Sequence, residues 1–186
     1  MPDLRAERLQ QLVEICREAG AAIMDVYRGE IEVSEKSDQS PLTQADLASH
    51  HIICDALAQL DPEIPVLSEE SAEIPWPERR SWRSYWLVDP LDGTKEFVNR
   101  NGEFTVNIAL IHDHVPVMGV VHVPVTGTSY FGNRELGAFR YRDGETVSIS
   151  TRETASPLVI AGSRSHANPD TEQRLAALGP YEFISM

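Results

Sequence analysis

The stretch that decides both the fold and the chemistry runs from residue 85 to residue 94 and reads Tyr-Trp-Leu-Val-Asp-Pro-Leu-Asp-Gly-Thr. Its first four residues form a compact apolar run, which is typical of a buried β-strand. Pro90 is expected to end that strand at Asp89, and Gly93 permits a tight backbone path into a following helix. The stretch therefore predicts a strand, an acidic turn and a helix in succession.

Two acidic pairs point to a metal site. Asp89 and Asp92 would converge at such a turn and repel one another unless a cation lay between them. Oxygen ligands with no His or Cys nearby favour Mg²⁺, or Mn²⁺ as its substitute. Glu69 and Glu70 follow another short apolar run, so they would complete a cluster at two strand ends. Each pair also has a simpler interpretation, in which Asp92 caps a helix and the glutamates lie in a solvated turn.

Two helices are predicted before these motifs. Apolar residues over positions 9–26 recur at steps of three and four, which predicts a helix that ends near Gly29. A second helix should begin after Thr43 and stop by Pro62. Thr43 and Asp46 resemble a capping box with Asp in place of the usual Glu. Such a box would fix the Asp46 carboxylate, so capping and a catalytic role are compatible.

Short strands dominate the rest of the chain. Apolar runs separated by turn signals predict strands over residues 104–111, 115–125, 128–131, 138–141, 146–149, 158–161 and 181–186. Residues 74–84 are interpreted as an excursion loop and residues 169–178 as a short helix. Two helices followed by many strands predict an α+β layered fold. We expect one domain over residues 1–155 and the start of a second over residues 156–186.

Composition excludes several classes of protein. The chain has 186 residues, with 16 Lys and Arg against 29 Asp and Glu, which gives a net charge of −13. This charge disfavours a nucleic-acid polymer as a partner, whereas a small anionic substrate held by a metal ion stays compatible. No apolar run is long enough to predict a transmembrane segment. Cys16 and Cys54 lack metal spacing, which favours free thiols and a cytoplasmic location.

The acidic motifs resemble a known family. Residues 89–94, preceded by Ser-Glu-Glu-Ser at 68–71, are similar to the inositol monophosphatase superfamily of Mg²⁺-dependent, Li⁺-sensitive phosphatases. Lys-Glu-Phe at 95–97, together with residues 37–46 and 162–166, resembles its 3′(2′),5′-bisphosphate nucleotidase branch. The resemblance runs from about residue 5 to the end. It implies a layered α-β-α-β sugar-phosphatase-like fold and hydrolysis of 3′-phosphoadenosine 5′-phosphate to AMP in sulfur assimilation.

The resemblance also implies a role for each matching residue. The Mg²⁺ ligands would be Glu69, Asp89, Asp92 and the backbone carbonyl of Leu91. The attacking water would be oriented and deprotonated by Thr94 with Asp46 or with the Glu69-Glu70 pair. The residues in contact with the substrate would be Glu69, Leu91, Asp92, Gly93, Thr94, Ser163, Arg164 and His166. Lys36 would neutralise a phosphate, or else lie as a solvated loop lysine.

One family motif is not found. The family carries a Trp-Asp pair near its C-terminus, but no Trp of this sequence precedes Asp, and the sequence stops at Met186. We therefore expect an incomplete C-terminal layer, with self-association as a homodimer or aggregate. An inositol or sugar monophosphatase and a catalytically inactive binding fragment are the alternative functions. The run His-Asp-His at 112–114 is interpreted as a hairpin turn rather than a metal site.

Overall fold

The computed structural model describes residues 4–35, 41–71, 73–154, 156–162, 174–175 and 177–185. Contacts divide the chain into two compact units, Met1–Ile149 and Ser150–Met186. The domain boundary at residue 155 stays a prediction. Among the described helices, none combines the length and the apolar character that crossing a membrane requires.

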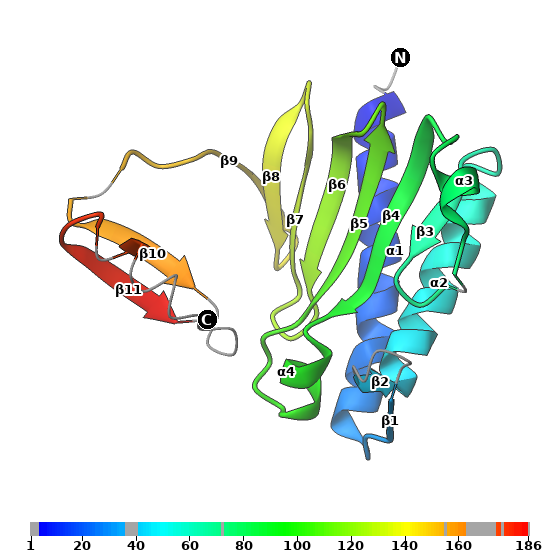
Figure 1. The fold of residues 1–186 in the computed structure, drawn as a ribbon, viewed down its shortest axis with the longest axis horizontal. Helices are drawn as coiled ribbons and strands as arrows, with labels where there is room; N and C mark the ends of the chain where they lie inside the picture. The colour runs from blue at the N-terminus through cyan, green and yellow to red at the C-terminus, as the bar shows by residue number, and fades with distance from the viewer. Residues whose placement is uncertain are drawn as a thin grey trace. The chain divides into compact units, whose positions relative to one another are not determined.

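A seven-stranded sheet forms the centre of the first unit, with its strands in the order β3-β4-β5-β6-β7-β8-β9 (Figure 1). The strands are β3 (Val66–Ser68), β4 (Ser84–Asp92), β5 (Thr105–His112), β6 (Val115–Val123), β7 (Thr128–Asn133), β8 (Gly137–Arg142) and β9 (Glu145–Ile149). Strand β3 runs parallel to β4, and every later neighbour is antiparallel. The predicted α+β class is confirmed.

Helices α1 (Leu4–Arg28) and α2 (Gln44–Leu60) lie side by side against one face of this sheet (Figure 1). The predicted stripe of α1 is buried, with Leu12, Cys16 and Ile23 fully shielded from solvent. The sheet contributes alternate residues of its central strands, including Trp86 and Ile108. Since side chains alternate along a strand, this face holds the core that fixes the positions of α2 and β4.

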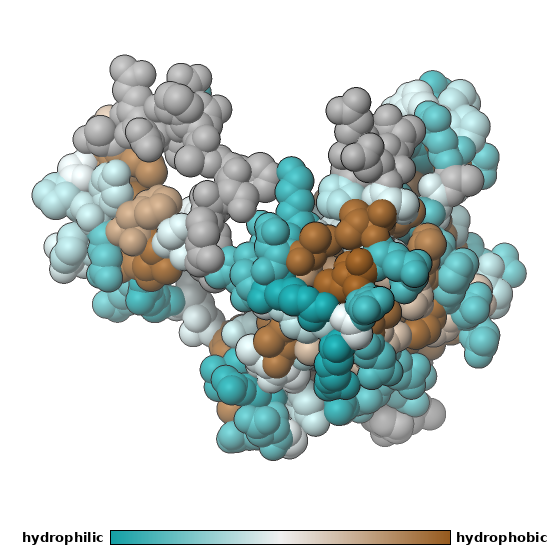
Figure 2. All heavy atoms as spheres, turned by 90° about the horizontal axis from the view of Figure 1, so that it is seen from below, coloured by the Kyte–Doolittle hydropathy of each residue, from teal (hydrophilic) through white to brown (hydrophobic). Residues whose placement is uncertain are grey.

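The opposite face of the sheet also carries apolar residues. Leu87, Val121 and Tyr130 alternate with core residues, and each of them is 43% exposed. Viewed from below, the molecule shows hydrophobic surface among hydrophilic side chains (Figure 2). The sheet is therefore apolar on both faces, although α1 and α2 pack on only one of them.

The strand that carries the acidic motif differs from the prediction. We expected it to end at Asp89, but β4 continues to Asp92. Asp89 pairs with Asn107 and Asp92 pairs with Thr105, so two residues of β4 oppose one residue of β5 in a bulge. Pro90 is tolerated because a residue in a bulge need not donate an N–H to the ladder.

One local prediction was also inaccurate. The excursion loop contains a short helix, α3 (Trp76–Arg79), which begins directly after Pro75. Between α1 and α2 along the chain, β1 (Val33–Glu35) pairs antiparallel with β2 (Pro41–Thr43).

The second unit contains a parallel pair of strands, β10 (Leu158–Gly162) and β11 (Tyr181–Ser185). Both strands were predicted. Of the expected helix at 169–178, Arg174 and Leu175 are helical, and most of the remainder lies outside the described residues. Ser163, Arg164 and His166 also lie outside them, so their predicted contact with the nucleotide stays a prediction.

Candidate active site

The parallel pairing of β3 with β4 brings two acidic residues together. Ser68 lies opposite Val88 in this ladder, and the Glu69 N–H donates to the Val88 carbonyl at 3.1 Å. The residue that follows each member of this pair along the chain is acidic, so Glu69 and Asp89 lie beside one another and share a side-chain hydrogen bond. Two carboxyl groups can share such a bond only when a proton lies between them.

The electrostatics of Asp89 are strongly perturbed. Burial, the charges of Glu69 and Asp92, and the hydrogen bond to Glu69 raise the pKa of Asp89 to about 7, while the Leu91 backbone N–H acts in the opposite direction. Within the described part of the chain, the Asp89 Oδ1 atom is buried without a hydrogen-bond partner. A buried anionic oxygen that lacks a donor is a position that a cation would stabilise.

The bulge leaves Asp92 exposed and in contact with the next strand. Asn107 Nδ2 donates to Asp92 Oδ2 at 3.1 Å, and Thr105 Oγ1 donates to Asn107 Oδ1 at 3.1 Å. Sequence reasoning missed Asn107. The signal that could have found it is a single amide within an otherwise apolar strand, since such a side chain needs a polar partner.

The residues fit a hard cation. Glu69, Asp89 and Asp92 offer only carboxylate oxygens, which suits Mg²⁺. Among the described residues, however, no group of three or more His, Cys, Asp or Glu side chains is arranged so that it could hold a metal ion. Asp92 is instead hydrogen-bonded to Asn107. The structure therefore brings Glu69 and Asp89 into contact, with Asp92 near enough to perturb Asp89.

The N-terminus of α2 holds a second carboxylate in place. The predicted capping box is confirmed, since the Thr43 N–H and hydroxyl donate to Asp46 Oδ2 at 2.8 and 2.6 Å. The other oxygen of this fully buried carboxylate, Oδ1, lies 3.1 Å from the Thr94 hydroxyl. Asp46 and Thr94 are therefore in contact, and their catalytic role stays a prediction.

Thr94 begins the short helix α4 (Thr94–Val98), which follows the bulge. Gly93 precedes it with φ of 96°, a left-handed conformation that favours glycine. A Cβ atom at Gly93 would lie 2.9 Å from the Glu103 carbonyl oxygen, so the close approach of the segment that leads into β5 also requires glycine. The Thr94 hydroxyl lies 3.3 Å from the Leu91 carbonyl. In Figure 1, α4, the end of β4 and the start of α2 lie at the lower end of the sheet.

The remaining predicted residues are less well defined. Glu70 is half-buried after β3, and its catalytic role stays a prediction. Lys36 lies outside the described residues.

An open hollow of about 730 Å³ reaches Glu69, Asp89 and Asn107 and continues along the apolar face of the sheet. The cluster is therefore accessible to a small molecule.

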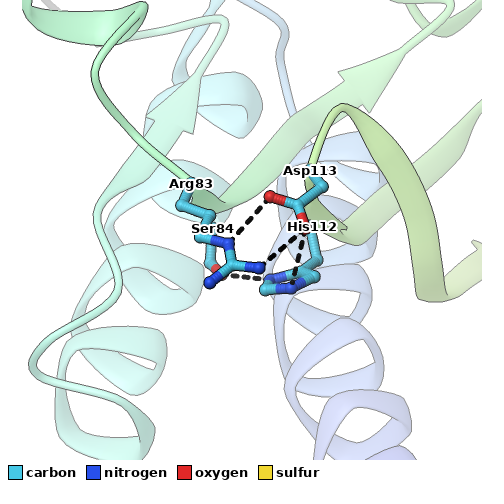
Figure 3. Close-up of polar contacts among 4 residues, drawn as sticks. All are labelled: Arg83, Ser84, His112 and Asp113. Atoms are coloured by element: carbon cyan, nitrogen blue, oxygen red, sulfur yellow. Dashed lines mark hydrogen bonds and ion pairs between the residues drawn. The ribbon is translucent and has the colours of Figure 1, made fainter.

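The run 112–114 forms a hairpin turn, as predicted. Asp113 and His114 have φ of 47° and 63°, and they connect β5 to β6. Figure 3 shows Arg83 holding the Asp113 carboxylate through two bonds of 2.8 and 3.0 Å, which lower the pKa of Asp113. Ser84 Oγ lies 2.7 Å from His112 Nδ1. Because Asp113 is engaged by Arg83, we interpret this cluster as a clamp on the hairpin.

Comparison with known proteins agrees with this geometry. The model of the inositol monophosphatase family matches residues 5–183. The chain belongs to the inositol monophosphatase family. The protein of Escherichia coli K12 named 3′(2′),5′-bisphosphate nucleotidase CysQ is 47% identical over 180 residues, which cover 96% of this chain and 72% of that protein. The protein of the same name from Haemophilus influenzae is 34% identical over 187 residues, which cover 99% of this chain and 69% of that protein.

A solved structure supports the fold of this family member. The crystal structure of CysQ from Bacteroides thetaiotaomicron, a bacterial member of the inositol monophosphatase family, matches with a TM-score of 0.77 at 37% identity. The match covers 96% of this chain and 72% of that one. The predicted resemblance and fold are confirmed, and this chain is shorter than these relatives.

Proposed function

We propose that this protein is a Mg²⁺-dependent phosphatase that hydrolyses the 3′-phosphate of 3′-phosphoadenosine 5′-phosphate, giving AMP and phosphate. The proposal rests mainly on one observation: the buried, unpartnered oxygen of Asp89 lies in an acidic cluster beside the Asp46–Thr94 pair. The choice of substrate is supported by relatives at 47% identity that carry the name 3′(2′),5′-bisphosphate nucleotidase.

In this proposal Glu69, Asp89, Asp92 and the Leu91 carbonyl hold the metal ion. When bound, Mg²⁺ neutralises charge on the phosphate and makes a nearby water more acidic. Asp89 must lose its proton before it can act as a ligand, since only the carboxylate form has both oxygens free to coordinate. Asn107 keeps Asp92 oriented through its 3.1 Å hydrogen bond.

Thr94 and Asp46 provide a path for the proton. The Thr94 hydroxyl donates toward Asp46 Oδ1, so its lone pairs are available to a water. As the water oxygen forms its bond to phosphorus, a water proton passes to Thr94 Oγ and the Thr94 proton passes to Asp46. The bond from phosphorus to the ribose 3′-oxygen breaks, and that oxygen takes a proton from solvent. Glu70 is the alternative acceptor for the water proton.

We assign phosphate binding to the backbone N–H groups that follow the bulge. The N–H groups at the start of a helix have no partner within the helix, which suits an anion at Gly93 and Thr94. Ser163, Arg164 and His166 are assigned to the nucleotide by resemblance alone. A cytoplasmic location is part of the same proposal and is supported by the free thiols Cys16 and Cys54.

Phosphate release tests the proposal. We expect turnover of 3′-phosphoadenosine 5′-phosphate with Mg²⁺ and none with chelator, and Glu69→Gln should abolish it. Glu63→Gln, at an exposed position in the turn after α2, is the matched control and should match the unaltered protein. Faster release from inositol 1-phosphate would refute the choice of substrate. Equal rates with Mg²⁺ and with chelator would refute the metal dependence, and no release from either substrate would refute catalysis by this chain.

A further inference from the structure

Helix α2 contacts both acidic segments through two consecutive residues. Ser49 Oγ donates to the Pro90 carbonyl at 2.7 Å, and His50 Nδ1 lies 2.8 Å from Ser68 Oγ. Pro90 lies between Asp89 and Leu91, whereas Ser68 directly precedes Glu69. One turn of α2 is therefore bonded to the Pro90 backbone and to the Ser68 side chain. These two residues adjoin the proposed metal ligands Asp89, Leu91 and Glu69.

The bulge explains why the first contact is needed. The β4–β5 ladder is interrupted between Asp89 and Asp92, so the pairing does not provide regular partners for Pro90 and Leu91. Pro90 is buried, and a buried carbonyl requires a donor. Ser49, which is fully buried on the face of α2 that packs on the sheet, supplies this donor. The Leu91 carbonyl is contacted separately by Thr94.

The second contact fixes the end of β3. Ser68 is 5% exposed and pairs with Val88 in the parallel ladder. His50 lies against its hydroxyl on one side, and Cys54 Sγ lies 3.6 Å from the same His50 nitrogen. Because Ser68 is the last residue of β3, restraining it restrains the direction in which Glu69 leaves the strand.

We propose that Ser49 and His50 are positioning residues that hold Asp89, Leu91 and Glu69 at the spacing that a divalent cation requires. This inference rests on the proposed function, because it assumes that these residues are the metal ligands. Neither residue touches the substrate or the cation in this proposal. Groups that orient metal ligands typically change metal affinity about 10- to 100-fold when they are removed.

The helix makes the test specific. Asp46 and Ser49 are three residues apart and share one helix face, so the face that presents the catalytic carboxylate also carries the first contact. Ala is a better helix former than Ser, so Ser49→Ala does not weaken the intrinsic stability of α2. A change in metal affinity would then report the lost hydrogen bond rather than a melted helix.

The experiment is Mg²⁺ titration calorimetry on the whole chain at a temperature well below the melting midpoint of every variant. Ser129→Ala is the matched control for Ser49→Ala, because Ser129 is also fully buried and bonds to His122 at 2.9 Å. His51→Ala, at an exposed neighbouring position, is the control for His50→Ala.

We expect Ser49→Ala and His50→Ala each to weaken Mg²⁺ affinity about 10-fold or more, with both controls within about two-fold of the unaltered protein. The two Ser variants should lose similar thermal stability, since each loses one buried hydrogen bond. Unaltered Mg²⁺ affinity in Ser49→Ala or in His50→Ala would overturn that residue's positioning role while leaving the proposed function intact. An unaltered protein that binds no Mg²⁺ would overturn the metal site and the positioning role together.

Discussion

Replacing Asp89 with Asn should stabilise the protein in metal-free buffer and abolish its response to Mg²⁺. The pKa of Asp89 is about 7 against its usual 3.8, so folding holds this carboxyl in surroundings that disfavour its charged form. At roughly 1.4 kcal/mol per pH unit, the full difference corresponds to about 4 kcal/mol of lost stability when Asp89 is ionised. Glu69 and Asp92 share in this perturbation, and their own protonation can adjust. We therefore expect Asp89→Asn to recover about half of the lost stability, or about 2 kcal/mol.

The direction of the Asp89 pKa shift fixes how the stability of the protein depends on pH. A raised pKa means that the folded protein binds a proton more tightly than the unfolded chain, so stability falls as the pH rises from about 4 to about 7. The advantage of Asp89→Asn should therefore be near zero at about pH 4 and complete at about pH 8. In a domain of this size, 2 kcal/mol corresponds to roughly 4 to 8 °C in the melting midpoint.

Thermal melting in chelator at a series of pH values measures this effect. Asp143→Asn, at an exposed hairpin position, is the control and should shift the midpoint little at any pH. Saturating Mg²⁺ should then raise the midpoint of the unaltered protein and leave Asp89→Asn unchanged. An offset between Asp89→Asn and the unaltered protein that stays constant from pH 4 to pH 8 would refute the reasoning.

Three further predictions concern the same end of the sheet. Thr94→Ala should lower turnover by a factor on the order of 10² with little change in melting, whereas Thr94→Ser should retain most activity in a phosphate-release assay. Gly93→Ala should cost about 2 kcal/mol by chemical denaturation, because its φ of 96° and the 2.9 Å approach to the Glu103 carbonyl both exclude a side chain. Asn107→Ala should weaken Mg²⁺ binding about 10-fold by calorimetry, and unaltered affinity would show that its bond to Asp92 is incidental.

The sequence predicted the parts of the site that depend on local chemistry. The Thr43–Asp46 box is such a part, since a cap and its partner lie three residues apart on one helix turn. The long α1 stripe was also predictable, because its period is repeated over many residues. Local patterns, however, carry no information on which distant strand will pair.

The contacts that the sequence did not predict are long-range or depend on backbone irregularity. Asn107 contacts Asp92 only because β5 pairs with β4 in one register across the bulge. Ser49 reaches Pro90 only because α2 packs on that strand. Pro90 itself was interpreted as the end of a strand, since a proline more often interrupts a ladder than occupies a bulge within it.

The parallel orientation of β3 is the feature on which the acidic cluster depends. All the later neighbours in the sheet are antiparallel, and an antiparallel β3 would direct Glu69 to the end of β4 opposite from Asp89. A parallel pair requires a long connection, which residues 69–83 supply with α3 inside it. The segment that we interpreted as an excursion loop is therefore what allows β4 to begin again at the same end as β3. The raised pKa of Asp89 is due first to burial and then to the Glu69 charge. The position of Glu69 beside Asp89, and hence this second contribution, follows from the connection as much as from the acidic motifs themselves.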